Sequence, residues 1–305
     1  MHAIARNLVH VTVVLIAPPL LLGVINKVKA FFAGRTGPRL LQPYYDIIKL
    51  FQKGSVISET TTWVFLAGPP IALATAITAS LLVPLGGSAA PISFVGDLIL
   101  AAYVLGLGRF FTALAALDTG SSFEGMGASR EVTFACLAEP AFFLGLATIA
   151  KLTGSLSLSG MFGPALAPFW GTSGASLALV FVGWFIVALV ENSRIPFDDP
   201  NTHLELTMIH EVMVLDHGGP ALGMILYGTA IKLFVFAALL VRLATPIATG
   251  WVIVDWSLFA IGMSAVAVMI GVIESVTARL RLSHIPVLLV AACLLCGFGL
   301  ILLAR

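Results

Sequence analysis

Eight long apolar stretches divide this 305-residue chain. A helix needs about 20 mostly apolar residues to cross a bilayer. None of the stretches shows the short alternating pattern of a barrel strand, so helices are the prediction. We therefore predict an all-α integral membrane protein with eight transmembrane helices. They cover residues 8–28, 62–84, 94–117, 132–152, 174–192, 221–243, 252–276 and 284–304.

The charge content supports a membrane protein and excludes other classes. Charged residues make up 10% of the chain and hydrophobic residues 59%, whereas soluble domains carry roughly 25% charged residues. The net charge is +1 and there is no basic stripe, so nucleic acid is not an expected partner. We predict one polytopic domain over residues 1–305, solvated by the lipid bilayer, with cytoplasmic docking loops near 30–60, 118–131 and 191–220.

Lysine and arginine are distributed unevenly between the two sides of the predicted bundle. The odd-numbered connections hold ten: Lys27, Lys29, Arg35, Arg39, Lys49, Lys53, Arg130, Arg194, Arg279 and Arg281. The other side holds four: Arg6, Lys151, Arg242 and Arg305. Because positive charge favours the cytoplasmic side, we predict that the odd connections are cytoplasmic and both termini lie outside.

Residues 40–53 predict a short amphipathic helix at the membrane surface. Its apolar stripe consists of Ile47, Ile48, Leu50 and Phe51, and its polar stripe of Asp46, Lys49 and Lys53. Two interpretations stay open, an interfacial anchor and a wall of a cavity at the edge of the bilayer.

Five ionisable residues fall within or at the ends of predicted transmembrane helices: Arg109, Glu139, Glu191, Lys232 and Glu274. A charge at the centre of a membrane costs about 2.5–3.5 kcal/mol on insertion scales and indicates function by default. One interpretation is structural ion pairing, such as Arg109 with Glu139 or Glu191. The other is a proton path, which the number of such groups in one small bundle favours.

The fourth predicted helix carries two carboxylates on one face. Glu131 and Glu139 are eight residues apart, about 12 Å along a helix. The preceding segment is rich in glycine and serine, and we expect Ser129 to cap the helix. This spacing predicts a carboxylate ladder that enters the bilayer from the cytoplasmic edge.

The fifth connection has the richest polar chemistry in the chain. Asp199-Pro200 predicts a helix start, and Asp216-His-Gly-Gly predicts a helix stop. The predicted apolar face holds Leu204, Met208 and Leu215, and the polar face holds His203, Thr207, His210 and Glu211. We interpret this segment as a buried acid/base network at the junction with a soluble partner.

Metal binding has weaker support. His210-Glu211 begins like a zinc-protease motif, but position 214 is Val rather than His, so the motif fails. Binding by His203 with His210 or Glu205 stays open. Cys293 and Cys296 have CxxC spacing without a second pair, which is typical of small buried residues rather than a metal site.

Three groups of motifs resemble the H-type membrane subunits of respiratory complex I, and more closely the anchor subunits of formate hydrogenlyase-type nickel–iron hydrogenases. They are Gly34-Arg-Thr-Gly-Pro with Leu41-Gln-Pro, Gly127-Ala-Ser-Arg-Glu131 with Glu139, and Glu191-Asn-Ser-Arg-Ile-Pro-Phe-Asp198. The run from Thr202 to Glu211 resembles the hydrogenase branch. The resemblance covers nearly the whole chain.

The resemblance implies a non-catalytic subunit in the cytoplasmic membrane of a bacterium or archaeon. Its expected partners are hydrogenase-like large and small subunits, an iron–sulfur subunit and antiporter-like membrane subunits. The nickel–iron centre and iron–sulfur clusters are expected on those partners, with no cofactor or metal bound by this chain. The complex would couple electron transfer to proton or sodium translocation.

Residue roles follow by match to the family and from the placement of the other charges. The expected proton path comprises Glu131, Glu139, Glu191, Asp198, Asp199, His203, Glu205, His210, Glu211, Lys232 and Glu274. The expected docking residues or charge partners are Arg35, Arg39, Arg109, Arg130 and Arg194.

Three alternatives stay open. One is a relative of the hydrogenase anchors whose partner subunit has lost the hydrogenase metal site. The resemblance also fits an NADH:quinone oxidoreductase subunit, in which the end of the first helix, the amphipathic helix and the fifth connection would build a quinone chamber. A stand-alone secondary transporter would predict discontinuous helices in an inverted repeat, and no internal repeat stands out in the sequence.

Overall fold

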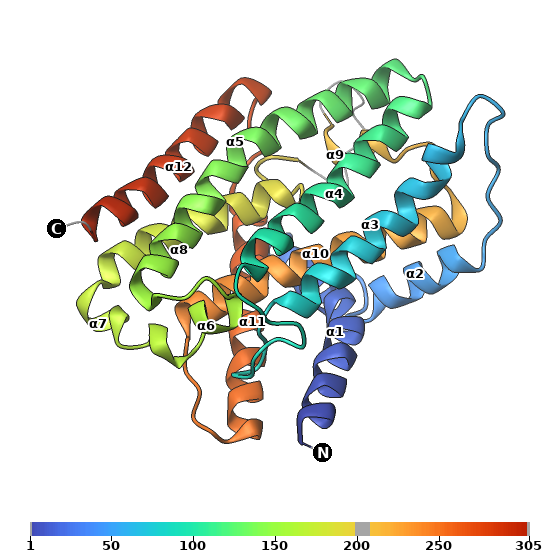
Figure 1. The fold of residues 1–305 in the computed structure, drawn as a ribbon. Coiled ribbons are helices and arrows are strands. Elements are labelled where there is room, and N and C mark those ends of the chain that lie inside the picture. Colours follow the sequence, from blue (N-terminus) through green and yellow to red (C-terminus); the bar gives the residue numbers. More distant parts are fainter. Residues whose placement is uncertain (1, 199–207, 304–305) are drawn as a thin grey trace.

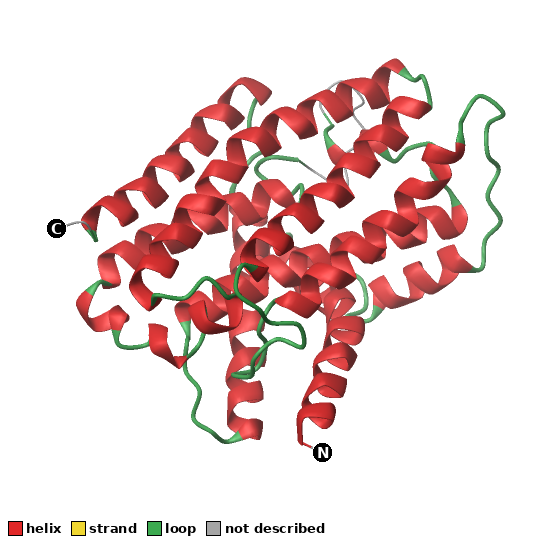
Figure 2. Cartoon of the chain, viewed as in Figure 1, coloured by secondary structure: helices red, strands yellow, loops and turns green. Residues whose placement is uncertain are grey.

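The computed structural model describes residues 2–198 and 208–303. Within these ranges the chain consists of helices and loops without a strand (Figure 2). Eight described helices are long and apolar enough to cross a membrane. They are α1 (His2–Phe32), α3 (Trp63–Leu82), α4 (Asp97–Asp118), α5 (Ser122–Thr153), α8 (Gly174–Glu191), α10 (Gly219–Ala244), α11 (Val252–Val276) and α12 (Ile285–Leu302). The predicted all-α membrane fold is confirmed.

Shorter helices lie in the connections. They are α2 (Gln42–Phe51), α6 (Leu158–Met161), η1 (Pro164–Leu166), α7 (Phe169–Thr172), α9 (His210–Met213) and η2 (Leu282–His284). The predicted amphipathic helix is therefore present as α2, which packs against α1 and α10.

The start of α5 differs from the prediction by ten residues. The helix begins at Ser122, so the predicted docking loop at 118–131 is mostly helical, and Ser129 lies inside the helix rather than at its cap. The Ser129 hydroxyl donates to the carbonyl of Met126 at 2.9 Å. The glycines that indicated a loop serve close packing instead, because a Cβ on Gly127 would lie 2.8 Å from the carbonyl oxygen of Ile209.

Helix α10 occupies the centre of the bundle, and it is the most buried of the eight described spans. It contacts α1, α2, α3, α8 and α11. Figure 1 shows α12, α5, α4 and α3 running roughly alongside one another, while α1 and α11 stand at a steeper angle. Polar groups on several helices can therefore converge on α10 from opposite sides.

The fifth connection begins inside the bundle. Helix α8 ends at Glu191, and most of the residues from there to Asp198 are buried. Their backbone groups are satisfied locally, for example by Arg194 N–H to the carbonyl of Leu189 at 2.8 Å, as a membrane interior requires. The first residues of the predicted docking loop at 191–220 are therefore buried in the bundle, and the cytoplasmic location of this connection stays a prediction.

The predicted helix within that connection is also wrong where it can be compared. In the described residues 208–216, α9 covers one turn, from His210 to Met213. Met208 is buried but Leu215 is exposed, so these two do not share an apolar face. Met208, Ile209 and Val212 are buried, and α9 packs against α5. These tertiary contacts, rather than the helical spacing of apolar residues, determine the backbone here. Asp199, Pro200, His203, Leu204, Glu205 and Thr207 lie outside the described residues.

Candidate functional site: a buried ion-pair network

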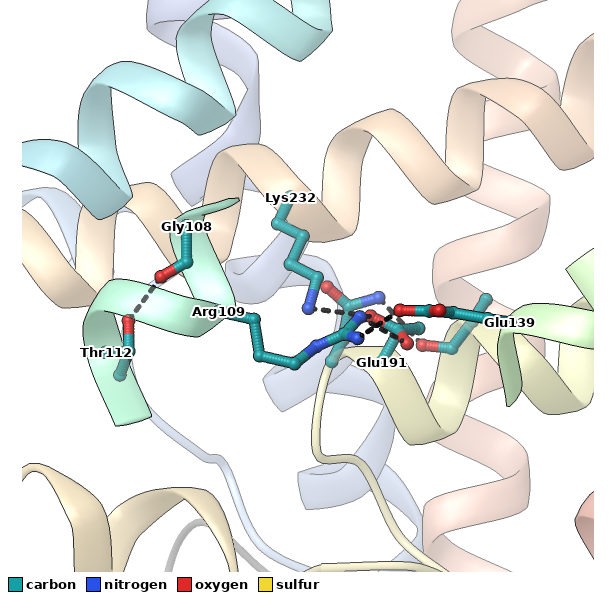
Figure 3. A network of polar contacts seen from close by, with 8 residues as sticks. Gly108, Arg109, Thr112, Glu139, Glu191 and Lys232 are labelled. Carbon is teal, nitrogen blue, oxygen red and sulfur yellow. Dashed lines mark hydrogen bonds and ion pairs between the residues drawn. The ribbon is translucent and has the colours of Figure 1, made fainter. Parts of the chain in front are cut away.

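Glu191 lies at the centre of a network of charges midway across the bundle. Its carboxylate accepts two hydrogen bonds from Nη2 of Arg109, at 2.7 and 2.6 Å. Nζ of Lys232 lies 2.9 Å from its Oε2 atom. Figure 3 shows the Arg109 and Lys232 side chains reaching this carboxylate from α4 and α10. Glu191 is the last residue of α8, whereas Arg109 lies near the middle of α4 and Lys232 near the middle of α10.

The network continues from Arg109 to α5. Nη1 of Arg109 lies 2.9 Å from Oε1 of Glu139, so one guanidinium joins two carboxylates. The Glu191 side chain is 6% exposed but that of Glu139 is 51% exposed. These four residues carry two positive and two negative charges. Pairing offsets the cost of removing each charge from water, and both ion pairs that the sequence suggested for Arg109 are confirmed.

A second group of charges lies near the end of α11. The carboxylate of Glu274 lies 2.8 Å from Nζ of Lys29 and 3.3 Å from Nη1 of Arg194. Its side chain is 0% exposed. These contacts join α1, α11 and the buried segment that follows α8.

Asp198 organises the described ends of the fifth connection. One carboxylate oxygen lies 2.9 Å from Nη2 of Arg279. The other accepts the backbone N–H groups of Ile209 and His210, each at 3.0 Å. Charge-assisted bonds of this kind are about twice as strong as neutral ones. Asp198 thus fixes α9 against the loop after α11.

Three neighbouring cavities are lined by members of these groups. A cavity of about 320 Å³ lies beside α2 and is lined by Asn26, Asp46, Arg194, His210 and Glu211, among others. A second, of about 60 Å³, is lined by Glu131, Glu191, Arg109, Lys232 and His210. A third, of about 10 Å³, lies between Glu131, Glu191 and Asp198. Charged side chains line part of the second cavity, and it is large enough for more than one water molecule.

A fourth space opens beside Glu139. It has a volume of about 320 Å³ and lies between α4 and α5, with Arg109, Glu139 and Glu191 among its lining residues. Its other walls are apolar and include Tyr103 and Phe143. Since Arg109 and Glu191 also line the second cavity, polar groups follow one another from the cavity beside α2 to this opening.

Most remaining predicted residues lie on the side of the bundle formed by the odd connections. Arg130 donates from Nη1 to the carbonyl of Met208 at 2.9 Å, so it holds the fifth connection against α5. Arg35 and Arg39 are exposed. Of the predicted path residues, Asp199, His203 and Glu205 lie outside the described part of the chain, and their roles stay predictions.

Sequence reasoning missed several members of this arrangement. Lys29 and Arg279 were counted as loop charges, although each pairs with a buried carboxylate. Glu124 is 1% exposed and accepts the backbone N–H of Asp216 at 3.2 Å. Burial lowers the pKa of the neighbouring His217 to about 4, against the opposing effect of Asp216. A charge directly after a predicted span was the available signal for Lys29, whereas Glu124 fell in the predicted docking loop at 118–131.

The fold and the site together define a polytopic membrane protein that holds paired charges inside the bilayer. The chain belongs to the NADH dehydrogenase family, whose model matches residues 5–305. The predicted resemblance to the H-type membrane subunits of complex I is thereby confirmed.

The chain is similar in sequence to membrane subunits of known hydrogenases. It is 34% identical to hydrogenase-4 component C of Escherichia coli over 240 residues, covering 78% of this chain and 74% of the relative. It is 30% identical to formate hydrogenlyase subunit 4 of Escherichia coli over 304 residues, covering 97% and 96%. A chain in the solved structure of the membrane-bound sulfane sulfur reductase, an archaeal respiratory membrane complex, has the same fold, with a TM-score of 0.84, 20% identity and 99% coverage of both chains.

Proposed function

We propose that this chain is the membrane-anchor and proton-path subunit of a multi-subunit redox complex. In this proposal a peripheral hydrogenase-like arm transfers electrons, and antiporter-like membrane subunits complete the translocation of protons or sodium ions. The hydrogenase-4 and formate hydrogenlyase relatives support the hydrogenase type of arm. The nickel–iron centre and iron–sulfur clusters belong to the partners in this proposal.

The observation that carries the proposal is the network of Lys232, Glu191, Arg109 and Glu139 midway across the bundle. An anchor alone gains little from four charges in the bilayer, since each must be desolvated and paired. Their placement beside cavities that several charged side chains line supports a role in which protons exchange between groups. Glu139 is the member that a proton could reach from the opening between α4 and α5.

The proposed coupling begins at the fifth connection. A charge change in the docked arm would act on His210 and the Asp198–Arg279 pair, because α9 is held through the carboxylate of Asp198. His210 lines both the cavity beside α2 and the cavity at Glu191. A proton that binds Glu139 would weaken its bond to Arg109 and leave that guanidinium to Glu191. Such a switch needs two protonation states biased by a remote event.

Replacing Glu139 by glutamine tests this role. Glu139→Gln keeps the shape of the side chain but cannot carry a proton as a carboxylate does. We expect assembly and electron transfer by the complete complex to stay near wild type, while ion translocation per electron falls severalfold. The measurement is proton uptake by inverted membrane vesicles during turnover.

Glu59→Gln is the matched control, because Glu59 is exposed in the connection between α2 and α3. It should leave both quantities unchanged. Normal translocation in the Glu139→Gln complex would remove Glu139 from the path.

A second candidate function is favoured by the cavity beside α2. Its volume of about 320 Å³ falls at the lower end of the range for small-molecule sites. Its lining residues come from α1, α2 and the fifth connection, which are the regions expected to build a quinone chamber, and also from α10. A photoreactive quinone should then label residues 35–50 of the intact complex, in competition with unlabelled quinone. Labelling confined to the lipid-facing surface of α12 would contradict this candidate.

A further inference from the structure

A shallow apolar groove follows the line where α1 meets α11, apart from the ion-pair network. Val24, Val28 and Phe31 form its α1 wall, and Val268 and Val272 form its α11 wall. Its volume is about 440 Å³. The groove lies toward the end of α1 that leads into the first connection, which the charge distribution predicts to be cytoplasmic.

Close backbone contacts give this groove a fixed shape. A Cβ on Gly271 would lie 2.7 Å from the Cβ of Val28, so α11 and α1 touch directly. The chain after α1 then folds back, and a Cβ on Gly23 would lie 2.1 Å from the carbonyl oxygen of Leu40. Leu40 itself lines the groove. The apolar channel is therefore bounded by two helices and a return loop.

One basic residue lines the groove, and two more lie in the return loop directly before residues that contact Lys27 or line the groove, Thr36 and Leu40. Lys27 is the charged residue that lines it, and its Nζ donates one hydrogen bond to the carbonyl of Thr36 at 2.9 Å. Arg35 and Arg39 lie exposed on the return loop. Within the described residues none of these three forms an ion pair, whereas Lys29 is taken up by Glu274. An ammonium group has three donors, so Lys27 has donors left for a ligand.

We propose that this groove binds an anionic phospholipid of the cytoplasmic leaflet. One acyl chain would lie between Val28 and Val272, and the phosphate would meet Lys27, with Arg35 and Arg39 adding positive charge. Basic pockets between helices on the cytoplasmic side suit anionic headgroups, and a lysine near a helix end extends its ammonium toward the interface. The charge at the mouth selects an anionic lipid over a zwitterionic one.

Such a lipid would act on the contact between α1 and α11. The same two helices are joined by the Lys29–Glu274 pair, two residues farther along α1 from Lys27. A bound lipid would therefore support the position of Lys29. This inference rests on the fold and on the sidedness predicted from the basic residues, and it stands whether or not the proton path does.

Photo-crosslinking tests the site directly in the intact complex. Photoactivatable phosphatidylglycerol and phosphatidylcholine, with the reactive group in the acyl chain, are reconstituted with the complex at equal density. We expect phosphatidylglycerol to label peptides containing residues 24–32 and 268–272 more strongly than phosphatidylcholine. Equal labelling by the two lipids would overturn the proposal, because charge would then play no part. Absence of lipid labelling, with these residues crosslinked to a neighbouring subunit, would also overturn it.

Three variants separate charge from shape. Lys27→Gln with Arg39→Gln should lower the ratio of phosphatidylglycerol labelling to phosphatidylcholine labelling by about fivefold for each charge removed. Val272→Trp should block the acyl channel while the charges remain. Lys53→Gln, which removes an exposed charge from beyond the end of α2, is the matched control and should change nothing. If the double charge variant and Val272→Trp both retain wild-type labelling, the site is excluded.

Discussion

Arg109 performs a task at the residue scale that lysine could not. One guanidinium lies within hydrogen-bonding distance of one oxygen of Glu139 and both oxygens of Glu191. Its planar fork of donors allows this, whereas an ammonium group is a compact point charge. Among the described residues, Lys232 forms an ion pair with Glu191 and with no second carboxylate. The two cations around Glu191 are therefore not equivalent.

Removing Arg109 should be more damaging than removing Lys232. Arg109→Met leaves two carboxylates without their shared partner, and breaking a buried pair costs about 3–5 kcal/mol. We expect a clear loss of thermal stability in detergent, with a smaller loss for Lys232→Met. Arg281→Met is the control, since Arg281 is exposed.

A double variant distinguishes pairing from packing. Arg109→Met with Glu191→Gln removes one charge of each sign, and we expect it to recover part of the lost stability. If the double variant is as unstable as the sum of the two single variants, the loss comes from packing of the arginine stem rather than from charge.

The sequence predicts some of these pairs and hides others for a physical reason. Arg109, Glu139 and Glu191 could be paired because each is a costly charge within or at the end of an apolar span. Lys29 and Arg279 lie where basic residues are expected anyway, so their signal merges with the charge bias that sets orientation. The pairing of Asp198 with Arg279 joins segments 81 residues apart, which no local pattern reveals.

At the scale of elements, α1 depends on side chains from its neighbours. Pro18 and Pro19 lie in the middle of this helix, and proline has no N–H to donate. The carbonyl of Leu15 would otherwise bond the N–H of residue 19, and it accepts the hydroxyl of Tyr227 at 2.6 Å instead. The hydroxyl of Tyr44 donates to the next carbonyl, that of Ile16. Two tyrosines thus bond carbonyls of α1 beside its proline pair, and the one from Tyr227 replaces a bond that Pro19 cannot make.

This arrangement predicts a specific double-mutant cycle. Tyr227→Phe should destabilise the protein by about 1–2 kcal/mol, because it leaves the Leu15 carbonyl unsatisfied. In a Pro19→Ala background the new N–H can bond that carbonyl, so the same tyrosine change should cost much less. The measurement is thermal unfolding of all four proteins in one detergent. Tyr103→Phe, an exposed tyrosine on α4, is the control, and equal costs in both backgrounds would contradict the explanation.

Helix existence was predictable from sequence, but some helix ends were not. The eight apolar stretches are each long enough to identify a transmembrane helix. The start of α5 was missed because Gly127 reads as a loop signal, while its absent side chain allows close contact with Ile209. The extent of α9 was missed because the helical pattern competes with the bonds of Ile209 and His210 to Asp198. Tertiary contacts decided both ends.

At the scale of the whole molecule, connections that lie together in the structure agree with the predicted sidedness. Thr62 bonds Asp118 and Asp216 bonds Glu124, which joins the first, third and fifth connections. Arg279 reaches Asp198 and joins the seventh connection to the fifth. On the opposite face, Ser93 bonds Ser157 and Arg242 bonds the carbonyl of Phe162. The bundle therefore has two consistent faces, one rich in basic residues.

Cysteine labelling tests which face is cytoplasmic. With Cys136, Cys293 and Cys296 replaced by alanine, single cysteines are placed at Val56 and Val95, which are 97% and 81% exposed on opposite faces. The excess of lysine and arginine on the odd connections predicts that an impermeant maleimide labels position 95 in intact cells, and position 56 after permeabilisation alone. Labelling both positions in detergent controls for reactivity. The reverse pattern would place the basic face outside, and the docking arm proposed for it would then have no access to cytoplasmic electron donors.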